Sequence, residues 1–284
     1  INKLGLLRKD LYVGNALVDM YAKCNLLGKA KEIFDMLPAR DVVSWNTLIS
    51  GYTNYEHGKE ALDCFYHMQC ANVQPNAITY TCCLKACGNV KDISKGRELH
   101  ALILQQGLLG KNVIICNALI EMYARCGCLE KAREILNKFP VQDVFSWNAL
   151  ISGYLKHNEC EKALECFRKM QMNGVRPDMF TFINILKACG ALGAIEEGKE
   201  VHAEIARRGF LERYLVIGNA LVDMYAKCGF LLNAHEVLKK LQIKDVITWT
   251  TLIGGYARQE YAADALDCYM QMRLEGFNPN AITL

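Results

Sequence analysis

The stretch GNALVDMYAKC at residues 14–24 returns as CNALIEMYARC at 116–126 and again as GNALVDMYAKC at 218–228. Successive copies are 102 residues apart, and the rare residues keep the same spacing. The tryptophans are Trp45, Trp147 and Trp249, and the prolines are Pro38 with Pro140 and Pro75 with Pro177 and Pro279. Self-similarity at a fixed period indicates a repeat architecture.

The composition leaves room for a large core. The 284 residues are 52% hydrophobic and carry a net charge of only +3. A disordered chain has low hydrophobicity and high net charge, so disorder is excluded. No uninterrupted apolar run reaches the roughly 18 residues that a membrane span needs, and residues 1–10 do not resemble a signal peptide.

Each 102-residue period contains three related phrases: NALVDMYAKC at 15–24, NTLISGYTNY at 46–55 and TCCLKACGNV at 81–90. Short, standard and long repeats therefore alternate along one domain that fills residues 1–284. We expect the repeats at 11–41, 42–76, 77–112, 113–143, 144–178, 179–214, 215–245 and 246–280. Residues 1–10 would end a preceding long repeat and 281–284 would begin the next, so we expect a segment of a longer array.

Two helices are predicted in each repeat. Trp45, Leu48, Ile49 and Tyr52 recur at the i, i+3, i+4, i+7 spacing of one helical face. A second apolar face follows Gly58 in the same repeat. No strand alternation of comparable length occurs. A hairpin of about 35 residues buries its apolar face only by stacking on the next hairpin, which predicts an all-α solenoid.

The phrases identify the kind of solenoid by resemblance. The 42–76 repeat comes close to the tetratricopeptide pattern, but Ile49 replaces the expected glycine and the repeat is one residue too long. DVVSWNTLISGY (41–52), NALVDMYAKC (15–24) and LKACG…GKEVHA (186–203) instead resemble the standard, short and long motifs of the pentatricopeptide repeat (PPR) family, in its plant PLS subclass. The resemblance implies a right-handed α-solenoid of helix-turn-helix repeats that binds single-stranded RNA, with about one base per repeat.

In that family the fifth and last residues of each repeat together select the base. Asparagine in a helix body is less favourable than alanine by roughly 0.5–0.7 kcal/mol, so its recurrence at the fifth place asks for a reason. The last residue is also placed to cap the next helix, and one side chain can do both. The fifth/last pairs are Asn15/Asp41, Asn46/Asn76, Thr81/Asn112, Asn117/Asp143, Asn148/Asp178, Ile183/Tyr214, Asn219/Asp245 and Thr250/Asn280.

The resemblance also implies what each pair reads. Asn with Asp favours U, Asn46/Asn76 favours C with U tolerated, Thr250/Asn280 favours A, and Thr81/Asn112 weakly suggests A. Ile183/Tyr214 matches no pair of the code. The implied site is 5′-U-C/U-(A)-U-U-N-U-A-3′.

The second residue of each repeat would sandwich the bases. These residues are Tyr12, Val43, Ile78, Ile114, Phe145, Phe180, Val216 and Ile247. All are apolar or aromatic, and stacking on an aromatic side chain is worth about 1–3 kcal/mol per base, which singles out Phe145. From the sequence alone, burial against the neighbouring repeat explains them equally well.

Basic residues recur at the thirteenth place of the short and standard repeats: Lys23, Arg125, Lys156, Lys227 and Arg258. We interpret them as phosphate contacts, although a lone cation near a helix C-terminus is usually a solvated charge. If all five neutralise phosphates, log K should fall with log salt with a slope of about −3.5.

The 14 cysteines form no C-x2-C pair, so no zinc loop is predicted. Cys24, Cys126 and Cys228 are in phase, as are Cys64, Cys166 and Cys268, and Cys87 with Cys189; we interpret them as small core residues in a reducing compartment. His202 and Glu204 match the H-x-E of zinc deaminases, but the downstream P-C-x-x-C is absent. No catalytic site, metal or cofactor is predicted.

The sequence therefore predicts a non-enzymatic, sequence-specific single-stranded RNA-binding array. By resemblance it would serve an organellar C-to-U editing factor, in a mitochondrion or chloroplast, with a deaminase domain or accessory editing proteins as partners and no membrane. Two alternatives remain: a PPR protein for organellar RNA processing, splicing or stability, and a peptide-binding helical scaffold.

Overall fold

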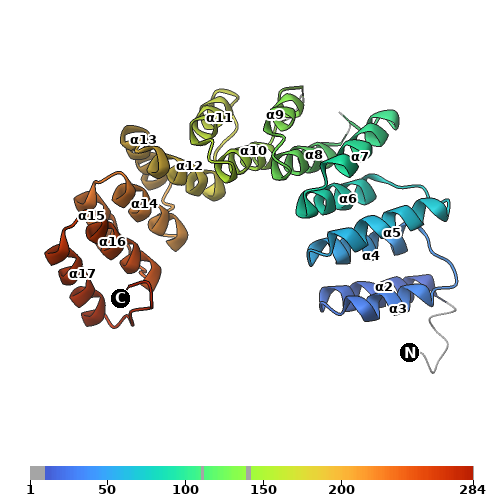
Figure 1. Cartoon of the computed structure of the whole chain (residues 1–284), viewed down its shortest axis with the longest axis horizontal. Coiled ribbons are helices and arrows are strands. Elements are labelled where there is room, and N and C mark those ends of the chain that lie inside the picture. Colours follow the sequence, from blue (N-terminus) through green and yellow to red (C-terminus); the bar gives the residue numbers. More distant parts are fainter. Residues whose placement is uncertain (1–9, 110–111, 139–141, 284) are drawn as a thin grey trace. The chain divides into compact units, whose positions relative to one another are not determined.

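The computed structural model describes residues 10–109, 112–138 and 142–283. Within these residues it contains sixteen α-helices and no strand (Figure 1). The helices are α2 (Leu11–Lys23), α3 (Leu27–Asp35), α4 (Val42–Asn54), α5 (Gly58–Cys70), α6 (Ala77–Val90), α7 (Ile93–Gln105), α8 (Val113–Arg125), α9 (Leu129–Lys138), α10 (Val144–Lys156), α11 (Cys160–Met172), α12 (Met179–Leu192), α13 (Ile195–Arg207), α14 (Leu215–Lys227), α15 (Leu231–Lys240), α16 (Val246–Arg258) and α17 (Ala262–Leu274). The all-α fold predicted from the sequence is confirmed. Apart from Asp10, the expected repeat tail 1–10 lies outside the described residues, as does Leu284.

Polar caps start the first helix of most repeats. The side chains of Asp41, Asn76, Asp178 and Asp245 accept hydrogen bonds from backbone N–H groups of the first turns of α4, α6, α12 and α16. Three of these ends are reciprocal capping boxes, in which a threonine three residues later bonds back to the cap. The expected N-cap role is confirmed at these positions. Tyr214 makes no side-chain cap at the start of α14.

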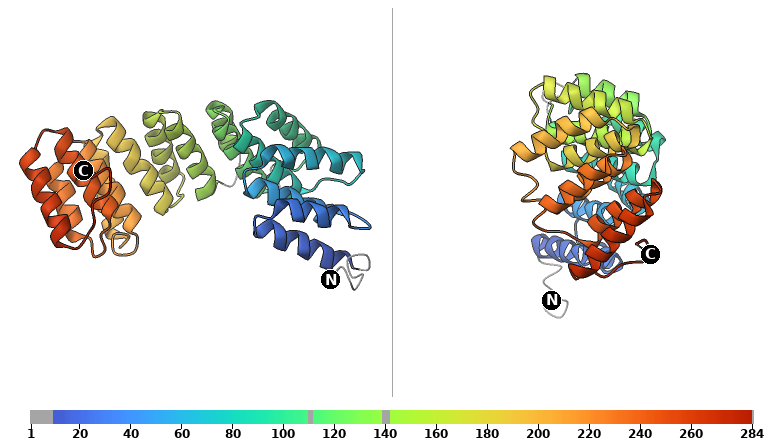
Figure 2. Two further views of the ribbon diagram at one scale, coloured as in Figure 1. Left: turned by 60° about the horizontal axis from the view of Figure 1, so that its bottom comes forward. Right: turned by 90° about the vertical axis from the view of Figure 1, so that its left-hand side faces the viewer.

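The helices form two compact units, residues 1–153 and 154–284, and the boundary falls within α10. In the N-terminal unit, α2 packs on α4, α4 on α6 and α6 on α8, while α3, α5, α7 and α9 each pack against the helix that precedes them. In the C-terminal unit, α12, α14 and α16 form the same kind of layer (Figure 2). First helices therefore build one layer of each unit and second helices the other.

The core repeats with the sequence period. Trp45, Trp147 and Trp249 are buried, and Cys64, Cys166 and Cys268 are buried in the second helices. Burial raises the pKa of the Cys87 and Cys189 thiols to about 12, so both stay protonated near neutral pH. These cysteines are small core residues, as expected.

Three other in-phase cysteines are not core residues, contrary to the sequence interpretation. Cys24 is exposed, and Cys126 and Cys228 are only half-buried. Each is the C-cap of its helix, where the chain turns away from the core. In the described part of the chain, no group of three or more His, Cys, Asp or Glu side chains could hold a metal ion. Nor is any of its helices long and apolar enough to cross a membrane.

Candidate nucleic-acid interface

The fifth residue of a repeat contacts the last residue of the same repeat in the pairs Asn46/Asn76, Asn117/Asp143 and Asn219/Asp245. Asn117 Nδ2 donates to Asp143 Oδ2 at 2.9 Å. Asn219 Nδ2 lies 3.3 Å from Asp245 Oδ2. Each contact joins the body of one first helix to the N-terminus of the next, because the last residue caps that next helix. Packing of first helices thus brings together residues 26 positions apart.

One carboxylate performs two tasks at these sites. Asp143 Oδ1 accepts from the backbone N–H of Ser146 at 2.9 Å, while Oδ2 accepts from Asn117. The side chain is only half-buried, so lone pairs of Oδ2 remain available to a donor from outside. At an Asn/Asp site the last residue therefore presents an acceptor.

The Asn46/Asn76 site presents the opposite polarity. Asn76 Oδ1 accepts from the backbone N–H groups of Ile78 and Thr79 and from Asn46 Nδ2 at 3.0–3.1 Å. Because the oxygen is committed to the cap, the amide nitrogen of Asn76 points away from it. The exposed last residue therefore offers a donor here.

The electrostatics keep two of the carboxylates charged. Burial raises the pKa of Asp143, but hydrogen bonds from Ser146 and Asn117 outweigh that effect and hold the pKa below its ordinary value. The pKa of Asp41 is lowered in the same way by Ser44 and Asn15. At neutral pH both side chains are ionised and can only accept hydrogen bonds.

The sequence interpretation missed a third polar member. Ser146 Oγ lies 2.5 Å from Asn117 Oδ1, and Thr79 and Thr248 make the equivalent bonds to Asn46 and Asn219. This is the third residue of the following repeat. Its signal was available, because serine or threonine recurs there with the 102-residue period: Ser44, Thr79, Ser146, Thr181, Thr248 and Thr283.

The remaining pairs differ from this arrangement. Thr250 Oγ1 lies 2.7 Å from Thr283 Oγ1, which also bonds Asn280 at 2.9 Å. Thr81 instead donates to the Ala77 carbonyl of its own helix, and Asn112 caps α8 without contacting it in the described hydrogen bonds. Ile183 and Tyr214 supply no such amide or carboxylate pair. Asn148 and Asp178 belong to different compact units, so their pairing stays a prediction.

The second residues lie beside these polar sites and face solvent. All eight are exposed, from Val43 at 53% to Phe145 at 70% and Tyr12 at 82%. The set is Tyr12, Val43, Ile78, Ile114, Phe145, Phe180, Val216 and Ile247. Burial against a neighbouring repeat is thereby excluded as their explanation. A regular series of exposed apolar side chains is the kind of surface that can cover the faces of bases.

The recurring cations fall into two groups. In the short repeats Lys23, Arg125 and Lys227 each pair at 2.7 Å with a carboxylate one turn earlier, on Asp19, Glu121 and Asp223. Lys156 and Arg258 in the standard repeats are exposed and have serine or glycine at the corresponding place. Their shared place in the repeat does not distinguish these two groups.

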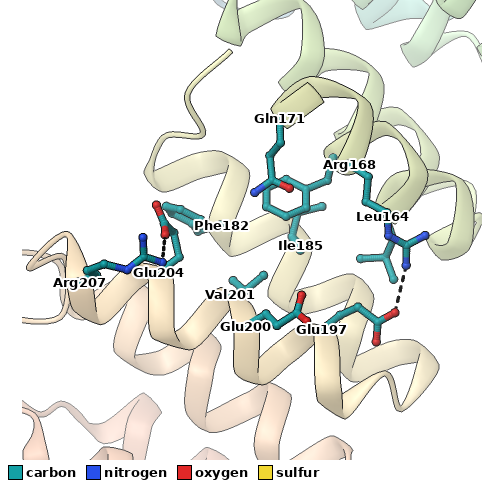
Figure 3. A pocket seen from close by; sticks show the side chains of 11 residues that line it. Leu164, Arg168, Gln171, Phe182, Ile185, Glu197, Glu200, Val201, Glu204 and Arg207 are labelled. Carbon is teal, nitrogen blue, oxygen red and sulfur yellow. Dashed lines mark hydrogen bonds and ion pairs between the residues drawn. The ribbon is translucent and has the colours of Figure 1, made fainter. Parts of the chain in front are cut away.

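A pocket of about 230 Å³ lies in the C-terminal unit between α11, α12 and α13 (Figure 3). Its wall includes Phe182 and two arginines that are already ion-paired: Arg168 with Glu197, and Arg207 with Glu204. None of the candidate base-selecting residues lines it. Both arginines of the pocket therefore already have a carboxylate partner.

Family models match the chain at the places that the period predicts. The description "PPR repeat family" matches residues 40–89, 142–191 and 244–284, and "PPR repeat" matches 15–42, 114–143 and 219–246. The chain belongs to the PPR repeat family. The prediction that the chain is a PPR protein is confirmed, and the matched segments together cover most of the chain.

Several curated proteins of Arabidopsis thaliana are similar to this PPR chain. Pentatricopeptide repeat-containing protein At4g38010 is 38% identical over 284 residues, all of this chain and 50% of the relative. At2g03880, named mitochondrial, is 36% identical over 98% of this chain and 43% of its own length. At4g18520, named chloroplastic, is 35% identical over 96% and 44%. The chain thus spans about half or less of these relatives.

Solved structures show the same fold. The crystal structure of the pentatricopeptide repeat protein PPR10 from maize superimposes with a TM-score of 0.77 and 19% identity, over 95% of this chain and 40% of that one. PPR10 in complex with an 18-nt psaJ RNA element gives a TM-score of 0.74, again at 19% identity, over 95% and 41%. The RNA in that structure is bound to PPR10.

Proposed function

We propose that this PPR chain binds single-stranded RNA and reads about one base per repeat, with 5′-U-C/U-(A)-U-U-N-U-A-3′ as its site. The observation that carries the proposal is the recurring polar contact between the fifth and last residues, with an exposed apolar second residue beside it. Polar groups that face a base edge and apolar groups that cover a base face are what single-strand recognition needs.

The polarity of the sites supports the proposed bases. Uracil carries a donor at N3 and carbonyl oxygens on either side, whereas cytosine carries an acceptor at N3. Asp143 offers an acceptor to a uracil N3–H, and the second hydrogen of Asn117 Nδ2 suits a carbonyl oxygen. Asn76 offers a donor, which suits cytosine N3. The Asp-for-Asn difference between the sites therefore accounts for U against C.

We further propose that the array serves an organellar C-to-U editing factor of the PLS subclass, with the repeat boundaries given above. The alternation of short, standard and long repeats supports the subclass. Relatives named mitochondrial and chloroplastic support an organelle. A deaminase domain or accessory editing proteins would supply the chemistry; the runner-up is organellar RNA processing without editing.

Binding of a peptide is the competing function from another class. The ion-paired arginines of the pocket in Figure 3 disfavour a carboxylate clamp at that place. The exposed apolar second residues and the amide–carboxylate pairs recur instead with the period of the repeats. That regularity suits a polymer with one recognition element per repeat.

The first test is a gel shift of the chain with UCAUUAUA-containing RNA, DNA of the same sequence, and scrambled RNA. We expect the matched RNA to bind at least tenfold more tightly than the other two, since a mismatched base costs about 1–3 kcal/mol. Equal binding to all three would contradict base-by-base reading.

A sharper test exchanges the base preference of one repeat. Asn117→Thr with Asp143→Asn recreates the Thr/Asn pair of the 246–280 repeat within the N-terminal unit. We expect the fourth base of the site to change from U to A while all others keep their preference. Asp92→Asn is the matched control, because Asp92 caps α7, a second helix, through Lys95 N and has no proposed base. An unchanged fourth base would leave Asn117 and Asp143 as structural residues.

A further inference from the structure

The hydroxyl at the third residue of a repeat lies inside the base-selecting site of the repeat before it. Thr79, Ser146 and Thr248 are fully or almost fully buried. Their oxygens approach Oδ1 of Asn46, Asn117 and Asn219 at 2.6, 2.5 and 2.5 Å. Each contact spans 29 to 33 residues of sequence and recurs where helices of successive repeats meet.

The shortest contacts indicate how the protons are placed at the Asn/Asp sites. An ionised carboxylate accepts hydrogen bonds only, so the Asn117 amide must turn Nδ2 toward Asp143. Its Oδ1 then faces Ser146, and two oxygens 2.5 Å apart need a proton between them. The Ser146 hydroxyl has one proton and lies 2.5 Å from Asn117 Oδ1 and 2.8 Å from Asp143 Oδ1. The shorter contact assigns this proton to Asn117 Oδ1, so the amide is held at both ends.

The 215–245 repeat repeats this arrangement in the C-terminal unit. Thr248 Oγ1 lies 2.5 Å from Asn219 Oδ1, and Asn219 Nδ2 faces Asp245. With its oxygen and one hydrogen engaged, the Asn219 amide has one Nδ2–H left. In this orientation the side chain keeps one Nδ2–H for a base, while its oxygen faces Thr248.

In the 11–41 repeat, the amide of Asn15 shows no such contact with a hydroxyl among the described residues. Ser44 Oγ bonds only to Asp41 Oδ1, at 2.9 Å, among the hydrogen bonds described. Asn15 Oδ1 is buried and has no hydrogen-bond partner among the described residues. A buried acceptor without a partner is unfavourable, so the asparagine of this site lacks a stabilising hydrogen bond that its counterparts have.

Two threonines at the fifth place provide a second contrast. For Thr250, the third residue of the next repeat is Thr283, and the two hydroxyl oxygens lie 2.7 Å apart. Thr81 is followed by the aliphatic Ile115, and its hydroxyl turns back to the Ala77 carbonyl of its own helix. The same side chain thus takes two orientations, according to the third residue of the next repeat.

We propose that Thr79, Ser146 and Thr248 are positioning residues, which fix the amide of the preceding asparagine so that it presents a donor and no acceptor to the base. The inference rests on the proposed RNA-binding function. Without the hydroxyl, only the contact with the last residue orients the amide, and Oδ1 is left to accept from the amino group of adenine or cytosine. The hydroxyl therefore sets discrimination between bases more than overall affinity. Long repeats, which are followed by Ile115 and Ile217, lack this device.

The test uses Thr248→Val, which replaces a hydroxyl by a methyl group of similar size. RNAs that differ only at the seventh base of the site are titrated against the whole chain. We expect the preference for U over A at this base to fall by about tenfold, while preferences at the other bases stay unchanged. Thr248→Ser keeps the hydroxyl and should keep the preference, whereas a merely structural role would not make the hydroxyl decisive for base choice.

Controls separate the possible failures. Thr251→Val removes a hydroxyl from the same helix that bonds only the Ile247 carbonyl among the described contacts, and it should leave base preference unchanged. Ser146→Ala repeats the test at the fourth base, should Thr248→Val weaken the cap of α16. An unchanged U preference in both variants overturns the positioning role and leaves the proposed function standing. A wild-type chain without preference at either base overturns both.

Discussion

At the scale of the residue, the last residue of a repeat combines a cap with a recognition group. A carboxylate has two oxygens, so Asp143 caps α10 with one and holds Asn117 with the other. An amide has one oxygen, so Asn76 caps with it and turns its nitrogen outward. Either residue starts the helix equally well. Base selection can therefore change without loss of the fold.

The pH dependence of stability follows from the lowered pKa of Asp143. In the unfolded chain this carboxyl titrates near 3.8, and in the folded chain below it. Its stabilising contribution is thus complete above the unfolded pKa and is lost as pH falls through the folded pKa. We expect Asp143→Asn to lose less thermal stability than wild type between about pH 5 and about pH 3, measured by circular dichroism. Equal losses would show that the carboxyl is not linked to folding.

At the scale of the element, close approach of first helices decides which small residues are required. A Cβ on Gly255 of α16 would lie 2.8 Å from Ala226 Cβ of α14 and 3.1 Å from Leu231 Cδ2. Gly51 meets Ala22 at the same 2.8 Å within the N-terminal unit. The second alanine of the repeated NALVDMYAKC phrase thus packs against the glycine of the next repeat. This contact brings the polar side chains of neighbouring first helices together.

Adjacent glycines of α16 provide a matched pair for this contact. We expect Gly255→Ala to destabilise the chain by about 1–3 kcal/mol, because the neighbouring backbone must shift. Gly254→Ala should be neutral or stabilising by up to about 1 kcal/mol, since its Cβ would meet only Arg258 Nη1 at 3.5 Å and alanine favours a helix. Urea denaturation of both variants measures the difference. Similar losses in the two variants would contradict the close packing of α14 and α16.

At the scale of the whole molecule, a net charge of +3 is too small for affinity through bulk charge. Affinity must come from groups that recur with the repeats. Because three of the five thirteenth-place cations already have carboxylate partners, we expect a salt slope shallower than the −3.5 for five free cations. Lys156 and Arg258 should carry most of the phosphate contact.

Charge variants of the C-terminal unit test this distribution. Asp223→Asn releases Lys227 from its ion pair and should steepen the slope of log K against log salt by about 0.7. Arg258→Gln should make it shallower by about the same amount. Glu236→Gln, on the second helix α15, changes the net charge as Asp223→Asn does and should have little effect. Equal effects of Asp223→Asn and Glu236→Gln would indicate that bulk charge drives binding.

The sequence by itself determined the helices, their caps and their repetition. Helix periodicity and capping depend on interactions between residues three or four positions apart. The 102-residue period is visible in the spacing of Trp45 and Pro75 from their counterparts in the later repeats. The same local signals placed the candidate base-selecting residues in register. They could not show which side chains meet across repeats.

The tertiary structure decided those meetings. The exposure of Phe145, the half-burial of Cys126 and the contact of Ser146 with Asn117 all depend on how one first helix packs against the next. Residues 29 positions apart share no local interaction, so only packing brings the hydroxyl to the amide. The repeat period places each residue in the array, and the contact between successive helices orients the side chain that would face the base.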